Sequence, residues 1–574
     1  MSEPTVAWRA APFSSCVALT AVLFATGASA ARAQDTQDTQ NTQDTEDTED
    51  AQGHRDLDGS ADSAAPGPGD TSRLATPPRE PSRMARRIEA VDAQFGRWVV
   101  VPIASVLMKD VWFWDDGGDP TDNTKVPFIV AWLILGAVFF TFRFRFINVR
   151  AFTHALRVVR GDFDDPSHAG EVSHFQALSS ALSATVGLGN IAGVAVAVKL
   201  GGPGALFWMV VAAFFGMTSK FAECTLGQMY RSVDETGRVL GGPMQYLKRG
   251  FAELGMTRLG KVMATLFAVL CIGGSFGGGN MFQSNQSYQG VIQIIPALDN
   301  AAGKLIYGVL LAALVGVVII GGIKRIGQVA SAIVPLMCGL YLIAGLIVLV
   351  TNVSAIPAAF ALIFERAFAP QAVSGGVVGV LAVGFQRAAF SNEAGVGSAA
   401  IAHSAAATDE PIREGIVASI GPFIDTVVVC LMTGLVLIVT GAWTADAEGV
   451  ALTSIAFQRV VPWFPDVLSV AVFLFAYSTL ISWSYYGERC WAYLVGEGKS
   501  LWYKLMYLGA VVLGSVLKLG SVIDFSDMMI LGMALPNIVG VIILSPKIGT
   551  ALDTYWAKLK SGQMTVNRGT PQTF

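Results

Sequence analysis

Long apolar segments constrain the fold of this chain more than any other feature. Eleven of them recur between residues 127 and 545, and most reach the about 20 residues of helix that cross a hydrocarbon core of about 30 Å. Hydrophobic residues make up 53% of the chain and charged residues only 14%, too few to cover a soluble domain. We therefore predict an all-α polytopic membrane protein with 11 transmembrane helices. The predicted spans are 127–142, 173–199, 204–229, 262–294, 304–321, 328–350, 371–390, 415–440, 467–487, 505–520 and 522–545.

The residues before the first span resemble targeting and linker sequence. Residues 1–33 have the arginine, apolar core and small-x-small end of a cleavable signal peptide, with an uncleaved anchor as the alternative. Residues 34–82 are acidic and then rich in proline, a composition that predicts a disordered periplasmic segment. Residues 83–126 combine arginines, an apolar stretch and tryptophans, which predicts a periplasmic interfacial segment before the transporter domain at 127–547.

Basic residues predict the orientation of the spans. The stretch that follows 127–142 carries five arginines, so it is predicted to be cytoplasmic. Lysines also follow the last span, so the tail 548–574 is predicted to be cytoplasmic and the mature N-terminus periplasmic. These signals together predict a multi-pass protein of a bacterial inner membrane. The net charge of −4 gives no reason to expect a nucleic-acid partner.

The ten spans after the leading helix 127–142 divide into two sets of five, 173–350 and 371–545. The first helices of the two sets then run in opposite directions, which is the sign of an inverted repeat. Both of these helices contain glycine clusters. Interrupted helices of this kind hold the substrate in transporters built from such repeats.

The strongest local motif is residues 185–193, Thr-Val-Gly-Leu-Gly-Asn-Ile-Ala-Gly, in the middle of the span 173–199. Glycine costs about 1 kcal/mol relative to alanine inside a helix, so we predict an unwound turn here. A carboxylate can accept hydrogen bonds from the freed N–H groups, while the carbonyls and Asn190 can coordinate a cation. Close helix packing through Gly189 and Gly193 is the alternative.

The span 371–390 and the residues after it offer two further breaks. Residues 374–379 lie about where symmetry with the first break places them, and we predict that they face the substrate. Residues 391–398, Ser-Asn-Glu-Ala-Gly-Val-Gly-Ser, are more polar, and we expect an inner gate there. The candidates from these stretches are Gly376, Val377 and Val378 for the substrate, and Arg387, Asn392 and Glu393 for the gate.

Polar residues in two other spans are candidates for the same site. Gln283 follows a triple-glycine motif, and an uncharged amide can hydrogen-bond a zwitterion at lower cost than an ion; interhelical bonding is the alternative. Ala476, Thr479 and Ser482 lie three residues apart and share a helix face whose oxygens suit a small hard cation. Trp483 can form a wall of a pocket that is sized for a methyl group.

Few ionisable residues lie inside the spans, and such residues are functional candidates. Asp425 is the deepest and is a candidate gate, cation or proton site. Lys220 and Glu223 lie near a predicted cytoplasmic end, where we expect snorkelling towards water. The six cysteines and five histidines are dispersed, without a C-x-x-C pair. We therefore expect neither an enzyme nor a cofactor, and no metal other than sodium.

These motifs together resemble the alanine or glycine:cation symporter family. The resemblance extends over 127–547 and implies a leucine-transporter-type fold of two inverted five-helix repeats plus one leading helix. It also implies uptake of alanine, glycine or a similar amino acid, coupled to sodium and in some members to protons. The matching motifs are residues 187–193 (Gly-Leu-Gly-Asn-Ile-Ala-Gly), 201–208 (Gly-Gly-Pro-Gly-Ala-Leu-Phe-Trp), 219–223 (Ser-Lys-Phe-Ala-Glu), 390–395 (Phe-Ser-Asn-Glu-Ala-Gly), 423–426 (Phe-Ile-Asp-Thr) and 482–488 (Ser-Trp-Ser-Tyr-Tyr-Gly-Glu).

The first break also resembles that of the wider neurotransmitter:sodium symporter group. By this resemblance Gly187, Leu188 and Gly189 would meet the carboxylate of the substrate. The usual Thr-Ser pair of that group is Thr479-Leu480 here, so Ser482 would replace the missing hydroxyl. The sodium ligands that the resemblance implies are the carbonyls of Ser183 and Val186, together with Ala476 and Thr479.

We therefore expect a symporter that imports a small neutral amino acid, alanine or glycine, with sodium by alternating access. A proton-coupled transporter that uses Asp425 or Glu393 is the nearest alternative. An ion channel is less favoured because it would need rings of like residues from several subunits. The expected partners are the amino acid, sodium and membrane lipid, and no nucleic acid.

Overall fold

The computed structural model describes residues 105, 107–111, 126–165, 167–234, 237–369, 376–517 and 519–564. The predicted signal peptide (1–33), the acidic segment (34–82) and nearly all of the interfacial segment (83–126) lie outside these residues. They remain predictions. Almost all of the described helices belong to one compact unit, which comprises residues 91–293 and 298–574.

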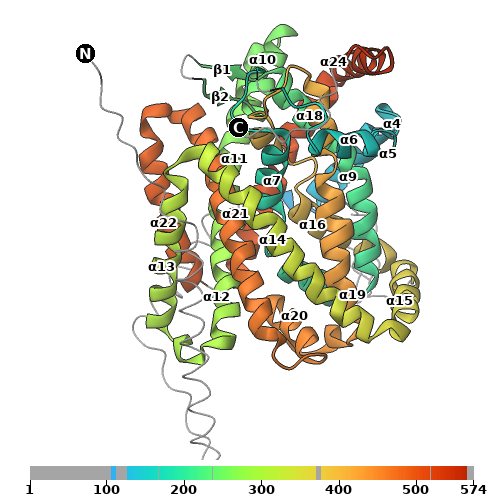
Figure 1. Ribbon diagram of the computed structural model, residues 1–574, viewed down its shortest axis with the longest axis vertical. Helices are drawn as coiled ribbons and strands as arrows, with labels where there is room; N and C mark the ends of the chain where they lie inside the picture. Colours follow the sequence, from blue (N-terminus) through green and yellow to red (C-terminus); the bar gives the residue numbers. More distant parts are fainter. Residues whose placement is uncertain are drawn as a thin grey trace, which may run out of the picture. The chain divides into compact units, whose positions relative to one another are not determined.

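The described part of the chain is mostly helical (Figure 1). The α-helices as far as Asn392 are α4 (Phe128–Arg143), α5 (Ile147–Arg150), α6 (Phe152–Val159), α7 (His174–Thr185), α8 (Val194–Gly201), α9 (Gly204–Met229), α10 (Pro243–Glu253), α11 (Thr257–Phe276), α12 (Phe282–Ile294), α13 (Ala301–Ile319), α14 (Gly322–Thr351), α15 (Ile356–Phe368) and α16 (Gly376–Asn392). Those after it are α17 (Ala399–His403), α18 (Pro411–Ala418), α19 (Leu431–Val439), α20 (Gly449–Gln458), α21 (Phe464–Val495), α22 (Ser500–Val516), α23 (Leu519–Gly532) and α24 (Ala534–Lys560).

Short elements complete the fold. The π-helical turns are η2 (Gly189–Gly193), η3 (Gly277–Met281) and η6 (Phe423–Cys430), and the 3-10 turns are η4 (Pro296–Leu298), η5 (Val353–Ala355), η7 (Ala442–Thr444) and η8 (Glu497–Lys499). The strands β1 (Ser232–Val233) and β2 (Val239–Leu240) pair antiparallel in a hairpin.

The helices confirm a multi-pass membrane protein. In the described part of the chain, seven helical segments are long and apolar enough to cross a membrane, where consecutive elements such as α11, η3 and α12 count as one segment. The bent pair α7 and η2–α8 adds an eighth span. The leading helix α4 and the loop helix α20 are apolar but shorter. The count of 11 spans and the inverted repeat therefore remain predictions, although a helix lies at each predicted segment.

Two features differ from what hydropathy predicted. The last helix was expected to end at 545, yet α24 continues to Lys560. Hydropathy falls where lysines begin, but an amphipathic helix can continue there with one face buried, as Ile548, Leu552 and Tyr555 are. The loop helix α15 was also not expected, because only the longest apolar segments were assigned to helices.

The helices with broken backbones lie at the centre of the fold (Figure 1). The helix α9 packs along α16 and α18, and α21 packs along α7, α11 and α14. Small residues allow close approach, as expected for helices in lipid. A Cβ built on Gly384 of α16 would lie 2.6 Å from Cβ of Trp208 on α9. We call the end of the fold that carries α10 and the hairpin the α10 side, and the opposite end, with α15 and α20, the α20 side (Figure 1).

Candidate functional site

The predicted break in the first core helix is present. The helix α7 ends at Thr185, and the axis of the following η2–α8 segment is bent from it by 52°. Residues 186–188 between them are not helical. Val186 leaves the helical region with ψ 81°, and every residue from 186 to 193 is buried. The glycine motif therefore interrupts the helix in the protein interior rather than only serving close packing.

Side chains satisfy the peptide groups that this break frees. The N–H of Gly187 donates to Oδ1 of Asn190 at 2.9 Å, and the N–H of Leu188 donates to Oε1 of Gln283 at 3.1 Å. The amide of Gln283 is held in turn by its Nε2, which donates to the carbonyl of Gly278 at 2.9 Å. The predicted candidate Gln283 therefore reaches the break from α12, and its oxygen occupies a position at which a carboxylate could accept the same hydrogen bond.

Hydroxyl groups gather beside the same break. Thr479 of α21 donates to the carbonyl of Ser183 at 3.0 Å, and Ser482 donates to Oγ of Ser183 at 2.8 Å. The hydroxyl of Ser183 donates to the carbonyl of Ser478 at 2.7 Å. All four side chains are buried, as are Val186 and Ala476. Oxygen atoms of the kind that coordinate a small hard cation therefore converge where α7 meets α21.

The first helix of the second predicted set of five is interrupted at residues 393–398, between α16 and α17, and we call this the second break. The other candidate, 374–379, stays a prediction as the substrate-facing break, because the structure describes only its residues 376–379. Gly376, Val377 and Val378 form the first turn of α16, while residues 374 and 375 lie outside the described part of the chain. At the second break the backbone is left-handed at Glu393 (φ 54°) and at Gly395 (φ 82°).

Buried side chains stabilise this second break. Trp483 donates from Nε1 to Glu393 at 3.0 Å, and Ser398 donates to the other oxygen of the same carboxylate. Lys220 of α9 donates to the carbonyl of Asn392 at 2.9 Å, and its side chain is only 2% exposed. The expectation that Lys220 snorkels is therefore wrong. Its ammonium group lies at the carbonyl end of α16, where a positive charge is favoured.

The two breaks meet at Asp425 of η6. Asn190, from the first break, donates to Oδ1 of Asp425 at 2.6 Å. Ser391, at the second break, and Thr426 each donate to Oδ2 at 2.8 Å. Asp425 is fully buried and thus joins both interrupted helices through hydrogen bonds. A Cβ built on Gly189 would lie 3.5 Å from Cα of Ser391, so the two backbones also approach each other closely.

A buried ion pair lies on α16 and α23, a little over one turn before the second break. Arg387 pairs with Asp527, and Gln386 donates to the same carboxylate at 2.9 Å. The guanidinium group also lies over the ring of Phe390, 5.5 Å from its centroid. Arg387 was predicted as a gate residue. Its partner Asp527 was missed, although an ionisable residue inside the predicted span 522–545 is itself a signal of function.

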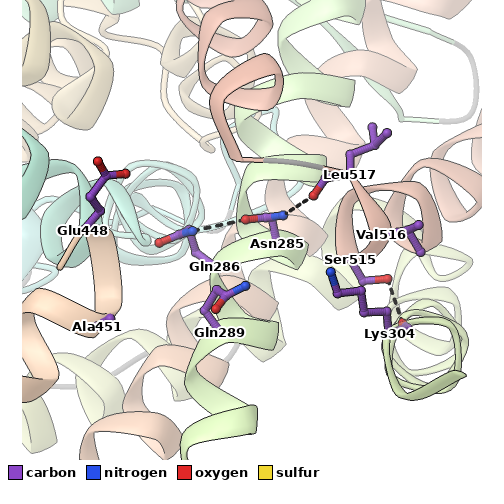
Figure 2. A pocket seen from close by; sticks show the side chains of 9 residues that line it. All are labelled: Asn285, Gln286, Gln289, Lys304, Glu448, Ala451, Ser515, Val516 and Leu517. Atoms are coloured by element: carbon purple, nitrogen blue, oxygen red, sulfur yellow. Dashed lines mark hydrogen bonds between the residues drawn. The ribbon is translucent and has the colours of Figure 1, made fainter. Parts of the chain in front are cut away.

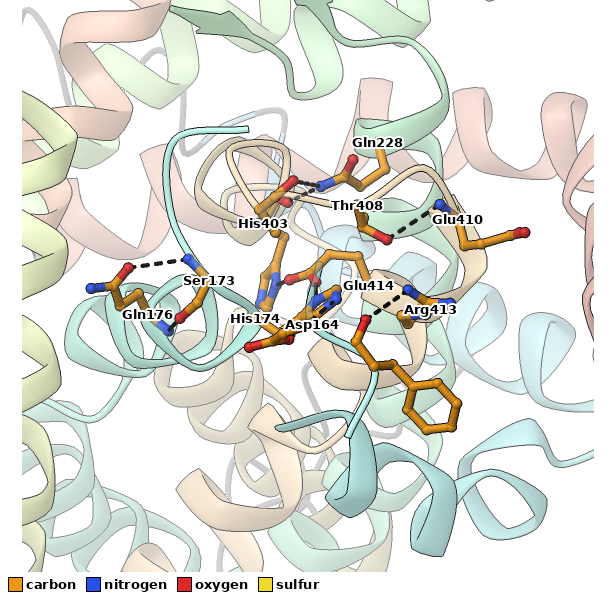
Figure 3. A network of polar contacts seen from close by, with 12 residues as sticks. Asp164, Ser173, His174, Gln176, Gln228, His403, Thr408, Glu410, Arg413 and Glu414 are labelled. Atoms are coloured by element: carbon orange, nitrogen blue, oxygen red, sulfur yellow. Dashed lines mark hydrogen bonds and ion pairs between the residues drawn. The ribbon is translucent and has the colours of Figure 1, made fainter. Parts of the chain in front are cut away.

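A second charged cluster lies at the α10 side (Figure 3). The carboxylate of Glu414 on α18 accepts from Nδ1 of His174, at the start of α7, and contacts Nδ1 of His403, at the end of α17. The three side chains are at most 1% exposed. Asp164 lies beside His174. Burial raises the pKa of the Asp164 carboxyl above its ordinary value, and the neighbouring His174 offsets only part of that rise. Glu414 therefore connects the α10-side ends of both interrupted helices.

Comparison with known proteins decides what kind of molecule carries this site. Residues 119–568 match the Sodium:alanine symporter family. The chain belongs to the sodium:alanine symporter family. The sodium/alanine symporter AgcS of Methanococcus maripaludis is 41% identical over 424 residues, which cover 73% of this chain and 92% of AgcS.

Other relatives in this family carry different names. The probable sodium/glutamine symporter GlnT of Bacillus subtilis is 35% identical over 441 residues, covering 76% of this chain and 89% of GlnT. The putative sodium/proton-dependent alanine carrier protein YrbD of the same organism is 35% identical over 456 residues, covering 75% and 90% of the two chains. Family membership makes this chain a sodium-coupled amino-acid symporter and not an enzyme.

The symporter site contains residues that sequence patterns did not identify. Glu414, His174 and His403 are far apart in sequence, and each sits in a stretch without a recognisable motif. Ser478 precedes Thr479 but was left out because it does not share the three-residue spacing of the predicted cation face. Among the described residues no group of three His, Cys, Asp or Glu side chains could hold a metal ion. The cation-binding candidates are hydroxyl, amide and backbone oxygens, together with the single carboxylate of Asp425.

Proposed function

We propose that this symporter imports alanine, glycine or a similarly small neutral amino acid together with sodium, by alternating access across a bacterial inner membrane. The observation that carries the proposal is the meeting of two interrupted helices at one buried position, where Asn190, Ser391 and Asp425 share hydrogen bonds. Such breaks at mid-membrane depth are where transporters of inverted-repeat architecture bind substrate and coupling ion.

The amino acid would bind through its carboxylate at the first break. The N–H groups of Gly187 and Leu188 now donate to side-chain amide oxygens, and a carboxylate can replace the oxygen of Gln283 at Leu188. The positive end of the following half-helix favours that negative charge. Gly189 borders the same position and was predicted to meet the carboxylate as well.

Sodium would bind among the hydroxyl groups where α7 meets α21. The carbonyl of Ser183 and the hydroxyl of Thr479 already lie 3.0 Å apart, and Ser482 adds a further oxygen. These groups hydrogen-bond one another in the structure, so a cation would take over as their common partner. The carbonyls of Val186 and Ala476 are the remaining proposed ligands, and Asn190 with Asp425 forms a second candidate position for a cation.

Crowding around Trp483 favours a substrate amino acid with a small side chain. A Cβ built on Gly279 of η3 would lie 2.3 Å from Cγ of Trp483, so the indole packs directly on the helix that carries Gln283. Phe282 and Phe390 close another side, with ring centroids 5.5 Å apart. Gly376, Val377 and Val378 form the first turn of α16, and contact of these residues with the substrate remains part of the proposal.

Alternating access needs a closure on each side of the site. We propose that the Arg387–Asp527 pair closes the α20 side, which would be periplasmic, and that Glu414 with its two histidines closes the α10 side, which would be cytoplasmic. The two sets of five spans would then be inverted repeats that move against each other. Asn392 ends α16 and Glu393 begins the turn that precedes α17, and both remain proposed gate residues.

Uptake into proteoliposomes tests this function. The purified full chain is reconstituted, and radiolabelled alanine and glycine uptake is measured with sodium and proton gradients imposed separately. We expect uptake with an inward sodium gradient alone. Uptake driven by a proton gradient in the absence of sodium would instead favour proton coupling, for which Asp425 and Glu393, both fully buried carboxyl groups, are the candidates. Steady currents through single molecules would indicate a channel.

A further inference from the structure

A cavity of about 300 Å³ lies on the α20 side, between α12, α13, the start of α20 and the end of α22 (Figure 2). Its volume is at the lower end of the about 300–1,000 Å³ that small-molecule sites occupy. That space suits a small amino acid with a few waters. The lining is unusual for an apolar helix bundle because five of its nine residues carry amide or charged side chains, among them Gln286, Gln289, Lys304 and Glu448.

The two charged groups lie on opposite walls of this cavity. In Figure 2 the ammonium group of Lys304 points towards Gln289, and Glu448 lies across the cavity beyond Gln286. Within the described part of the chain, neither charged side chain makes a hydrogen bond or ion pair, and the amide of Gln289 makes none either. The ammonium of Lys304 instead lies 5.9 Å from the ring centroid of Tyr288. One cation, one anion and one amide are thus free to bind a ligand that carries both charges.

The cavity is adjacent to the first break. Gln286 lies one helical turn from Gln283, which accepts the hydrogen bond from Leu188. The oxygen of Gln286 accepts from the N–H of Val450 at 3.3 Å, at the start of α20. Thr453 of α20 donates to the carbonyl of Ile191 at 3.3 Å, so α20 covers the α20-side end of the broken helix. The cavity therefore lies on the α20 side of the break, about one turn of α12 away from Gln283.

We propose that this cavity is a second binding site for a zwitterionic amino acid, which holds the substrate before it reaches the break. Lys304 would bind the carboxylate, Glu448 the ammonium group, and Gln289 would donate to or accept from either end. The side chain of the amino acid makes no specific contact, so the site selects for the zwitterion rather than for its size. The inference rests on the proposed function, because it takes amino acids as the transported class and the α20 side as the side of entry.

The test is the concentration dependence of alanine uptake by proteoliposomes that contain the full chain. Lys304→Gln and Glu448→Gln each remove one charge, whereas Lys304→Arg keeps it. We expect the KM for external alanine to rise about three- to tenfold in the two Gln variants, the range for losing one charged contact at a half-exposed site. The maximal rate and the sodium half-saturation should stay within twofold of wild type, and Lys304→Arg should largely restore the KM.

Two matched controls lie outside the cavity. Asp446→Asn removes an exposed charge from the loop that carries Glu448, and Lys109→Gln removes an exposed lysine elsewhere on the surface. An unchanged KM in both cavity variants would overturn the second site, as would an equal rise in the controls, since the effect would then be one of general surface charge. Wild-type uptake without any sodium dependence would instead refute the proposed function, so the two failures are distinguishable.

Discussion

Replacing Gly187 by alanine tests whether the geometry of the first break is required for binding. A Cβ at this position would lie 2.4 Å from Oγ1 of Thr479 and 3.2 Å from Oε1 of Gln283. Overpacking of this kind costs about 1–3 kcal/mol. If Thr479 rotates away, its hydrogen bond to Ser183 is lost, which adds about 0.5–1.5 kcal/mol.

The combined cost of about 1.5–4.5 kcal/mol falls on the groups proposed to hold the amino acid and sodium. Because about 1.4 kcal/mol corresponds to a tenfold change in affinity, we expect Gly187→Ala to weaken alanine binding and uptake at least tenfold. The assay is sodium-driven alanine uptake in proteoliposomes, normalised to the amount of monodisperse protein recovered.

Gly193→Ala is the matched control. Gly193 ends the same η2 turn with helical dihedral angles, and a Cβ there meets nothing within 4 Å. Alanine is also favoured over glycine in a helix by about 1 kcal/mol, so this variant should transport like wild type. Equal uptake by the two alanine variants would refute the reasoning, because the close approach of Thr479 to Gly187 would then have no consequence.

Three further predictions concern the contacts around the breaks. Thr479→Ala removes a proposed sodium ligand, so the sodium concentration for half-maximal uptake should rise about tenfold; a sodium titration that matches wild type would contradict this role. Asp527→Asn leaves the buried Arg387 without its counter-charge, which typically costs about 3–5 kcal/mol, so thermal unfolding in detergent should shift to lower temperature. Adding Arg387→Gln should recover part of that loss, and a further decrease would count against the pair. Glu414→Gln weakens the link between α7 and α17, so amide hydrogen exchange in α7 should accelerate; exchange as slow as in wild type would show that Glu414 does not hold the helices together.

Much of the fold was predictable because lipid imposes one requirement on every span. A chain that crosses hydrocarbon must satisfy its peptide groups internally, so apolar segments of sufficient length become helices, and a helix is present at each predicted segment. The break at 186–188 was predictable for the same reason, since clustered glycines and an asparagine weaken a helix while supplying a local partner. Hydropathy could not locate α15 or the end of α24, where amphipathic helices continue beyond the apolar core.

The contacts within the site were less predictable because they join residues that are distant in sequence. The position of Gln283 could be proposed from its depth, but its bond to Leu188 depends on how α12 packs on the break. The choice between residues 374–379 and 391–398 rested on assumed symmetry, and the interruption that the structure describes lies within the second of these motifs. The buried ammonium of Lys220 stabilises the interruption at the second motif by donating to the carbonyl of Asn392. Such stabilisation depends on tertiary packing and leaves no local signal.

The shared use of the first break by amino acid and cation can be measured as a coupling between their affinities. Equilibrium binding of radiolabelled alanine to the purified chain should be followed over a sodium titration, and sodium binding over an alanine titration. We expect sodium to tighten alanine binding about 5- to 150-fold, and alanine to tighten sodium binding by the same factor, as thermodynamic linkage requires. Alanine binding of equal affinity in sodium and in potassium would contradict a common site at Gly187–Asn190.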